Sequence, residues 1–320
     1  MKRIDLTGRF KRISLCKKKR WARKMIEKMG AERFYKCPYF YSSLFYMTVF
    51  GQWPSLRHPK DVNQLLMKLN IDALTDNKQK SLRIQCADKW RVRDYVKSKG
   101  LEEILVPLYG AYDSFDDIDF DQLPNRFVVK TNYACGQNLI CKDKSKLDIP
   151  SWSKQFADWM AIEQIGVPSA EWHYDFIRHK IVVEKYLESI ASDSMEDYKF
   201  HCFNGQVFGC LIVYDREKSA HGYSLKHYDA DWQEQPYIDS LHIGTNRSFD
   251  KPKDYDRMVD IARTLSKDFP YCRVDLYAVK DGIRFGELTF TPAANAMDYY
   301  TEEAKREMLR FYKSTLKKQL

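Results

Sequence analysis

Apolar residues recur at helical spacing near both ends of the chain and at several points between them. Residues 17–29 carry apolar side chains at intervals of three and four, namely Trp21, Met25, Ile26 and Met29. A second stripe of this kind follows Pro59 and consists of Val62, Leu65, Leu66 and Leu69. Further helices are predicted from Asp88 to Gly100, from Ser151 through Met160, from Tyr255 to Leu265 and from Thr301 to Leu320.

Short strand-like runs alternate with these helices from residue 104 onward. Single strands are predicted at 104–108, 126–130, 138–142 and 181–187. Two further runs, 197–203 and 206–214, are joined by Asn204-Gly205, the dipeptide most typical of a two-residue hairpin turn. Another hairpin covers 272–290. Antiparallel hairpins with covering helices indicate an α+β fold.

The hairpin YCRVDLYAVKDGIRFGELTF, residues 271–290, carries an informative polar pattern. A two-residue turn at 281–282 would put Asp275 and Glu287 on opposite faces. A three-residue turn at 280–282, ending in a left-handed glycine, would put them opposite each other. Only the second register separates the polar from the apolar side chains, so it is the one predicted.

Two directly opposed carboxylates repel each other unless a positive charge lies between them. Mg²⁺ prefers such hard oxygen ligands, and in this register Arg273, which pairs with Thr289, could contact a transferred phosphate. Alternatively, Arg273 neutralises the acids on a solvated sheet face. The spacing alone does not separate these two interpretations.

Composition excludes a disordered or collagen-like chain, since 44% of the residues are hydrophobic and 14% aromatic. The charge is unevenly distributed. Residues 1–36 hold fourteen Lys and Arg against Asp5, Glu27 and Glu32, a net charge of +11, whereas the whole chain carries +9. The remainder is therefore close to neutral, and nucleic acid is not expected as a partner.

The eight cysteines show no spacing typical of a zinc site, and the basic N-terminus lacks the apolar core of a signal peptide. These features predict a cytoplasmic protein. Residues 37–56 run without a charge but contain two prolines and several polar residues, which disfavour a membrane-spanning helix. This aromatic segment either packs inside the protein or, with the basic residues before it, contacts the anionic inner face of the cell membrane; the candidate membrane contact is residues 1–56.

Five motifs in sequence order resemble the ATP-grasp superfamily, and more closely its group related to the teichuronopeptide-biosynthesis protein of bacterial surface-polysaccharide gene sets. They are DKWRVRDYVKSKG (88–100), LPNRFVVKTNYACGQNLICK (123–142), VVEKYL (182–187), DYKFHCFNGQ (197–206), and RVDLY with FGELTFTP (273–292). The resemblance implies an ATP-grasp fold with a helical, basic N-terminal region. Its predicted parts are an N-terminal region (1–85), a central segment (86–125), a small subdomain (126–190) and a C-terminal subdomain with the metal-binding hairpin (191–320).

The resemblance also implies the residues that bind ATP and Mg²⁺. The predicted nucleotide-binding residues are Lys89, Lys130, Glu184, Tyr186, Leu187 and Asp197. The predicted catalytic residues are Arg273 and Lys199, and the predicted Mg²⁺ ligands are Asp275, Glu287 and Thr289. Two positions depart from the common pattern: Thr289 stands where many ATP-grasp enzymes have asparagine, and the loop at 131–137 has a single glycine.

By the same resemblance, the expected reaction is ATP-dependent ligation of a carboxylate and an amine through an acyl phosphate. The expected substrates are a sugar or glycan carboxylate and an amino acid or other amine. A glycosyltransferase is an alternative, because Asp117-Ile118-Asp119 provides an Asp-x-Asp pattern. An ATP-grasp kinase and a non-enzymatic adaptor are further alternatives.

Overall fold

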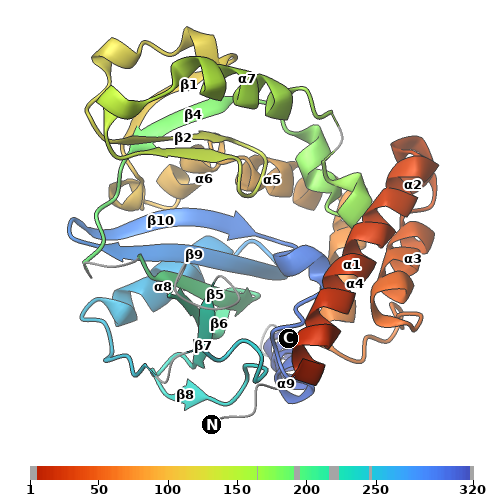
Figure 1. Cartoon of the computed structure of the whole chain (residues 1–320). Helices are drawn as coiled ribbons and strands as arrows, with labels where there is room; N and C mark the ends of the chain where they lie inside the picture. The colour runs from red at the N-terminus through yellow and green to blue at the C-terminus, as the bar shows by residue number, and fades with distance from the viewer. Residues whose placement is uncertain (1–5, 164, 191–194, 216–222, 245–246, 318–320) are drawn as a thin grey trace.

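The computed structural model describes residues 6–163, 165–190, 195–215, 223–244 and 247–317, and their side chains from residue 17 onward. These residues form two antiparallel sheets, one above the other in Figure 1. The four-stranded sheet has the order β1-β4-β2-β3 and is built from β1 (Leu108–Tyr112), β2 (Phe127–Thr131), β3 (Asn138–Cys141) and β4 (Ile181–Lys185). The six-stranded sheet has the order β10-β9-β5-β6-β7-β8 and is built from β5 (Asp197–Phe203), β6 (Gln206–Tyr214), β7 (Ser224–Tyr228), β8 (Glu234–Gln235), β9 (Tyr271–Val279) and β10 (Gly282–Thr289).

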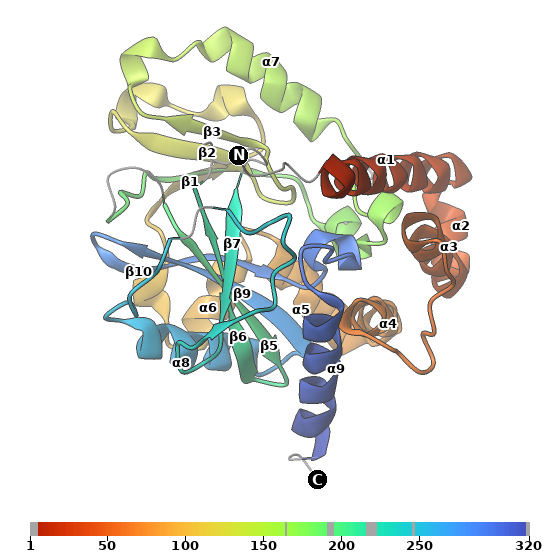
Figure 2. The same ribbon diagram turned by 60° about the horizontal axis from the view of Figure 1, so that its bottom comes forward.

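Helices cover both sheets and form a separate group at one side of them (Figures 1 and 2). The group at one side is α1 (Leu6–Met29), α2 (Ala31–Lys36), α3 (Pro38–Phe50) and α4 (Val62–Thr75), whereas α5 (Asn77–Ala87) packs on the six-stranded sheet. The remaining helices are α6 (Val92–Ser98), α7 (Ile149–Met160), α8 (Tyr255–Ser266) and α9 (Glu302–Lys317). The predicted α+β class is thus confirmed, and α5 is a helix that the sequence pattern did not predict.

The six-stranded sheet is buried on both faces, each by a different set of helices. On one face, apolar side chains of β9 and β10 such as Val274 and Leu288 share a core with α6 and α8. On the other face, Leu211 and Leu225 pack with α4 and α9. The polar residues of the predicted site therefore occupy only the part of this second face that the helices leave free.

The predicted strand at 104–108 is wrong. The chain there forms a short 3-10 turn, Glu102–Ile104, and the strand β1 begins at Leu108. Ile104, Leu105 and Val106 are all buried, at 2–7% exposure. A run of consecutive apolar residues is the pattern of a buried strand. Here the side chains are buried in the core, but the backbone does not pair with another strand.

The two predicted hairpins both form. Asn204 and Gly205 have φ values of 49° and 75°, as a two-residue turn of this type requires. In the β9–β10 hairpin the predicted three-residue turn is wrong, because Gly282 pairs with Val279. The predicted pairing of Asp275 with Glu287 is nevertheless confirmed, as is that of Arg273 with Thr289, because a register shift between Phe285 and Glu287 supplies the extra residue further along the strand.

The basic N-terminal helix packs on the body of the protein. Ala22 and Ile26 on α1 have no exposed surface, and the helix contacts α3 and the 3-10 turn η5 (Val167–Ser169). Lys19 Nζ donates to the Ala296 carbonyl at 3.1 Å and lies 3.2 Å from Asp298 Oδ1. Within the described part of the chain, no helix is long and apolar enough to cross a membrane.

Candidate ATP-binding and metal site

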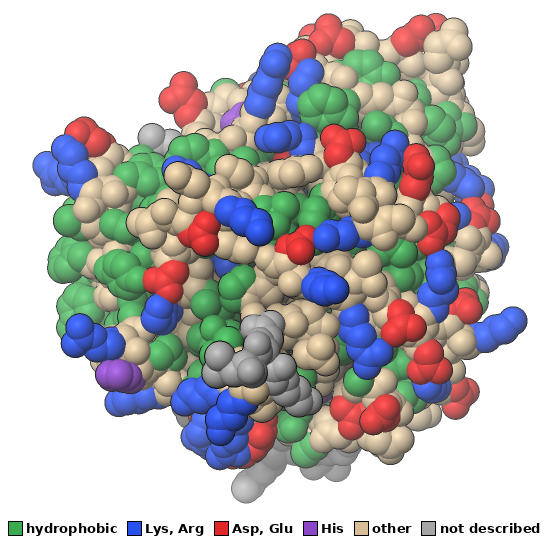
Figure 3. Space-filling view, turned by 180° about the vertical axis from the view of Figure 1, so that it is seen from behind, with side chains coloured by type: hydrophobic (Ala, Val, Ile, Leu, Met, Phe, Trp, Pro, Cys, Tyr) green, Lys and Arg blue, Asp and Glu red, His purple; other side chains and the backbone are tan. Residues whose placement is uncertain are grey.

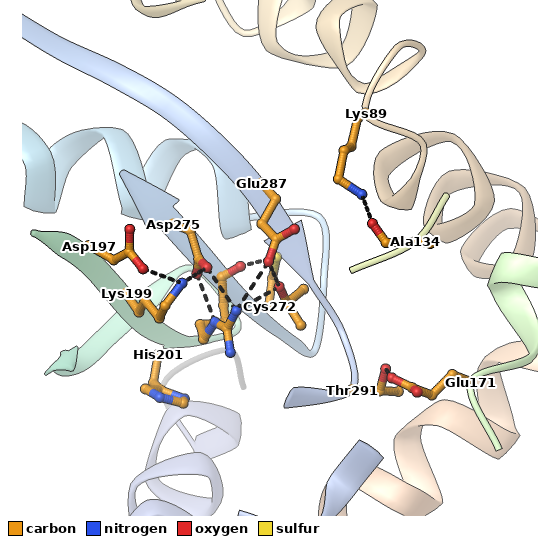
Figure 4. Close-up of polar contacts among 12 residues, drawn as sticks. Lys89, Ala134, Glu171, Asp197, Lys199, His201, Cys272, Asp275, Glu287 and Thr291 are labelled. Carbon is orange, nitrogen blue, oxygen red and sulfur yellow. Dashed lines mark hydrogen bonds and ion pairs between the residues drawn. The ribbon is translucent and has the colours of Figure 1, made fainter. Parts of the chain in front are cut away.

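The predicted metal-binding residues gather around one guanidinium group on the β9–β10 hairpin (Figure 4). Arg273 Nε donates to Asp275 Oδ1 and Arg273 Nη2 to Asp275 Oδ2, each at 2.7 Å. The same Nη2 donates to Glu287 Oε1 at 3.3 Å and to Thr289 Oγ1 at 3.0 Å, and Thr289 Oγ1 donates to Glu287 Oε1 at 3.2 Å. The structure therefore brings these four predicted residues into one hydrogen-bonded group.

Electrostatic effects within this group favour its charged forms. Burial raises the pKa of Asp275, but Arg273 and Lys199 outweigh burial and lower it below the ordinary value. Burial likewise disfavours the charged form of Arg273, whereas Asp275 and Glu287 raise its pKa well above the ordinary value. Asp275 is 1% exposed, while the side chain of Glu287 is 40% exposed. Glu287 is thus the carboxylate of the group that faces solvent.

Lys199 and Asp197 approach the same group from the neighbouring strand. On β5, Lys199 pairs directly with Asp275 and Asp197 with Tyr277. Lys199 Nζ donates to Asp275 Oδ2 and lies 3.6 Å from Asp197 Oδ2. Both predicted residues therefore belong to the polar cluster, with Lys199 between two carboxylates.

A second cluster lies on the four-stranded sheet. Lys130 on β2 and Glu184 on β4 form an ion pair, with 2.6 Å between Nζ and Oε2. Arg93 on α6 lies 3.7 Å from Glu184 Oε1 and donates to the Val106 carbonyl at 2.8 Å. Arg93 was not predicted, although its spacing of four from Lys89 in a helical pattern was a signal that could have identified it.

Lys89 lies in the electrostatic field of both clusters. Its Nζ donates to the Ala134 carbonyl at 2.6 Å, and its backbone N–H donates to the Asn132 carbonyl at 2.9 Å. Burial lowers the pKa of Lys89, Lys130 lowers it further, and Glu287 acts in the opposite direction. Residues from both sheets therefore influence one ammonium group, which is the arrangement expected of a site between the sheets.

Asn132 organises the loop that follows β2 and was also missed from the sequence. Its Nδ2 donates to Asp88 Oδ1 at 2.9 Å and to the Arg178 carbonyl at 3.0 Å, and its Oδ1 accepts from the Lys180 backbone N–H at 2.8 Å. Asp88 Oδ1 also accepts from the backbone N–H of Trp90 at 2.8 Å. This buried amide ties the start of the central helical segment, which carries Lys89, to the loop at 131–137.

Tyr186 and Leu187 lie in the segment that leaves β4 toward the six-stranded sheet. Both are half-buried, and the guanidinium of Arg126 lies 5.4 Å from the centroid of the Tyr186 ring. Just beyond them, the Glu188 carbonyl accepts from the Lys280 backbone N–H at 3.3 Å. The connecting segment is therefore attached to the β9–β10 turn, while the adenine contacts assigned to Tyr186 and Leu187 stay predictions.

The comparison with protein families gives one match, the model described as TupA-like ATPgrasp, over residues 67–310. The chain belongs to this TupA-like ATP-grasp family. Family membership confirms the predicted fold and the predicted class of enzyme, an ATP-dependent ligase. Among curated proteins there is no match.

Solved structures resemble this TupA-like ATP-grasp protein at low identity. The D-alanine–D-alanine ligase of Bacillus anthracis is 15% identical, with a TM-score of 0.42, 72% of this chain and 67% of that chain covered. The D-alanine–D-alanine ligase of Helicobacter pylori is 11% identical, with a TM-score of 0.41 and coverage of 78% and 68%. The L-amino acid ligase of Bacillus licheniformis is 12% identical, with a TM-score of 0.42 and coverage of 71% and 49%.

The oxygen atoms of the hairpin suit Mg²⁺ better than a softer metal. Among the described residues, no three His, Cys, Asp or Glu side chains come together as a metal site. Mg²⁺ is commonly held by one or two carboxylates, with water and substrate phosphate completing its octahedron. Glu287 has an exposed carboxylate, Asp275 would share its oxygens with Arg273 and Lys199, and Thr289 adds a neutral oxygen. The donor set of this TupA-like ATP-grasp protein therefore fits Mg²⁺.

Proposed function

We propose that this protein uses ATP to join a carboxylate to an amine, through an acyl phosphate, in the biosynthesis of a bacterial surface polysaccharide. The observation that carries the proposal is the cluster in which Arg273 contacts Asp275, Glu287 and Thr289. The charges of Glu287 and Lys130 both influence the pKa of Lys89. The proposed carboxylate belongs to a sugar or glycan, and the amine to an amino acid or related compound. Family membership supports the reaction class.

The proposed reaction needs charge neutralisation and alignment, and no nucleophile from the protein. A substrate carboxylate oxygen forms a bond to the γ-phosphorus, and the bond from that phosphorus to the bridging oxygen of ADP breaks. The ammonium group of the second substrate first loses one proton to solvent. The amine nitrogen then bonds to the acyl carbon, phosphate leaves with the electrons of its carbon–oxygen bond, and a second proton passes from the nitrogen to solvent. Arg273, Lys89 and Lys130 would offset charge on the phosphates. Mg²⁺ held by Glu287, Asp275 and Thr289 would add the same kind of stabilisation.

The competing glycosyltransferase interpretation gains no support from its acidic motif. Asp117 Oδ2 accepts from the Ser114 backbone N–H at 3.0 Å, and Asp119 Oδ1 accepts from the Asp121 backbone N–H at 3.1 Å. These two acids cap short turns on the surface, which accounts for their presence without a nucleotide sugar. An ATP-grasp kinase would use the same phosphate-binding groups. The two enzymes are therefore distinguished by their product, a phosphate ester for a kinase and an amide for a ligase.

The decisive experiment incubates the protein with ATP, Mg²⁺ and pools of uronic acids or nucleotide uronates, with and without amino acids. We expect carboxylate-dependent ADP release, a hydroxamate when hydroxylamine replaces the amine, and an amide when the amine is present. A stable phosphate ester would instead indicate a kinase, and sugar transfer without ADP release would indicate a glycosyltransferase.

Glu287→Gln should abolish turnover while leaving the circular dichroism spectrum unchanged, and Glu163→Gln, which changes an exposed glutamate, serves as its control.

We also propose that residues 1–56 hold this cytoplasmic enzyme at an anionic membrane face. Trp21, Tyr39, Phe40 and Trp53 are each 47–61% exposed, and basic side chains lie among hydrophobic ones over the side where the N-terminal helices lie (Figure 3). Among the ion pairs of the described residues, α1 contributes only Lys19. Lys17, Lys18, Arg20 and Lys24 of α1 are exposed, so their charges can reach lipid phosphates.

A further inference from the structure

Glu171 is a half-buried carboxylate next to the metal hairpin, and no sequence motif singled it out. It lies between the 3-10 turns η5 and η6 (Trp172–Phe176). Its Oε1 accepts from Thr291 Oγ1 at 2.7 Å, and the Ser169 side chain is a second hydrogen-bond partner. None of the ion pairs among the described residues includes Glu171, and Arg23 on α1 is the cation whose charge it feels. Among the described residues, the hydrogen-bond partners of this carboxylate are the hydroxyl groups of Thr291 and Ser169.

The backbone on both sides of Glu171 is held in place. Its own N–H donates to the Gly166 carbonyl at 2.9 Å. Asn70 on α4 donates from Nδ2 to the Ala170 carbonyl at 2.6 Å, and its own carbonyl accepts from Trp172 Nε1 at 2.8 Å. The Trp172 side chain has no exposed surface. The carboxylate is therefore fixed in position by the scaffold and is not carried on a free loop.

Glu171 is connected to the metal hairpin through Thr291. Thr291 follows Glu287 and Thr289 at intervals of two and is 1% exposed. Figure 4 shows the Glu171–Thr291 contact in the same view as the Glu287 cluster but apart from it. Burial and the charges of Glu171 and Glu287 raise the pKa of Tyr174 well above its ordinary value. Glu171 thus lies at one end of the same site, on the wall formed by the N-terminal helices and η5.

A carboxylate that loses part of its hydration is destabilised unless a cation or several hydrogen bonds compensate. Burial raises the pKa of Glu171, and Thr291, Ser169 and Arg23 offset that effect only in part. The proposed reaction requires an amine substrate, which is an ammonium ion in neutral water and needs a matching acceptor when it leaves the solvent. A fixed carboxylate without a cationic partner supplies that acceptor.

We propose that Glu171 binds the ammonium group of the amine substrate, oriented by Thr291 and Ser169. This inference rests on the proposed ligase function and assigns its second substrate to a place in the structure. It gives the two ligated substrates separate positions. The carboxylate substrate lies near Arg273 with the phosphate of ATP, and the ammonium group of the amine substrate lies at Glu171. A purely structural role for Glu171, in which Arg23 moves to pair with it, is the competing explanation.

Glu171→Gln tests this proposal, because glutamine keeps the hydrogen-bonding shape and removes the charge. The amine dependence of amide formation is compared with carboxylate-dependent hydroxamate formation at saturating hydroxylamine. We expect the KM for the amine to rise at least about tenfold, with the KM values for ATP and the carboxylate unchanged. Glu171→Asp should recover part of the amine affinity. The control Glu163→Gln should have the same amine KM as the wild type. An unchanged amine KM, or an equal loss of affinity for all substrates, would overturn the assignment.

A binding measurement separates failure of this inference from failure of the ligase proposal. The proteinogenic amino acids, their D-isomers and ethanolamine are added singly, and the melting temperature is recorded for the wild type, Glu171→Gln and Arg23→Gln. We expect at least one amine to stabilise the wild type and Arg23→Gln but not Glu171→Gln. Equal stabilisation of wild type and Glu171→Gln, or stabilisation of none, would refute the ammonium site. Absence of carboxylate-dependent ADP release in the wild type would refute the ligase proposal alone.

Discussion

Glu287 lies directly opposite Asp275 because Gly286 is an extra residue in strand β10. Phe285 pairs with Leu276 and Glu287 with Asp275, so Gly286 has no partner of its own. A Cβ atom at Gly286 would lie 2.9 Å from Tyr277 Cε2 and 3.0 Å from the Asp275 carbonyl oxygen. The spacing of the two predicted metal ligands therefore depends on a glycine that contacts no substrate.

Gly286→Ala should disturb this pairing. The new methyl group meets backbone that cannot rotate away, so we expect a loss of about 1–3 kcal/mol in the free energy of unfolding and a loss of most activity. Gly282→Ala is the matched control, since Gly282 has a φ of 98° and open space around it. It should also lose about 1 kcal/mol of stability yet keep its activity. Denaturant unfolding and ADP release measure both effects, and full activity in Gly286→Ala would contradict the role of the bulge.

Lys130→Met should weaken ATP binding by about tenfold or more, because it removes the ammonium that faces the proposed phosphate position. The variant also leaves Glu184, whose side chain is 8% exposed, with only Arg93 at 3.7 Å. Lys142→Met, which changes an exposed lysine just beyond β3, is the control. Calorimetric titration with ATP and Mg²⁺ makes the comparison, and equal affinities in the two variants would remove Lys130 from the nucleotide site.

The stability of the ligand-free protein should depend on Glu171 as the pH rises. The folded protein holds the pKa of Glu171 above its ordinary value of 4.5, through burial and the charge of Asp175, against the opposing effects of Thr291, Ser169 and Arg23. A raised folded pKa means that its stabilising contribution is complete below about pH 4.5 and is lost as pH rises through the folded pKa. We expect Glu171→Gln to be relatively more stable than wild type above that pH. Urea unfolding from pH 4 to 8 tests this, with Glu163→Gln expected to follow wild type.

Neutralising the exposed charges of α1 should reduce binding to anionic vesicles. Removing the helix would expose the core that Ala22 and Ile26 help to bury, so substitution is the cleaner test. A variant with glutamine at the exposed Lys17, Lys18, Arg20 and Lys24 should bind phosphatidylserine vesicles at least about tenfold more weakly and keep its ATP affinity. Sedimentation with vesicles at two salt concentrations provides the measurement. Equal binding by both proteins would reject the membrane contact.

Local pattern predicted those elements whose stability depends mainly on neighbouring residues. The β5–β6 hairpin was predicted at its observed bounds because Asn204-Gly205 favours a turn that few other dipeptides adopt. Strand β2 and helix α8 were placed within one residue, since their apolar spacing reflects a single buried face. Helix α5 was missed because its mixed charges give no clear stripe, and it is held by contacts with α4 and η6.

The sequence by itself determined the family, many of the helices and strands, and most of the residues that meet at the two polar clusters. Those features follow from motifs and from the two periodicities of helix and strand, which are local. Only the tertiary structure decided that a bulge at Gly286 sets the hairpin register, that Arg93 and Asn132 support the nucleotide side, and that Glu171 lies beside the metal hairpin. Glu171 and Thr291 are separated by 120 residues, so their contact depends on how the elements pack together and leaves no local signal in the sequence.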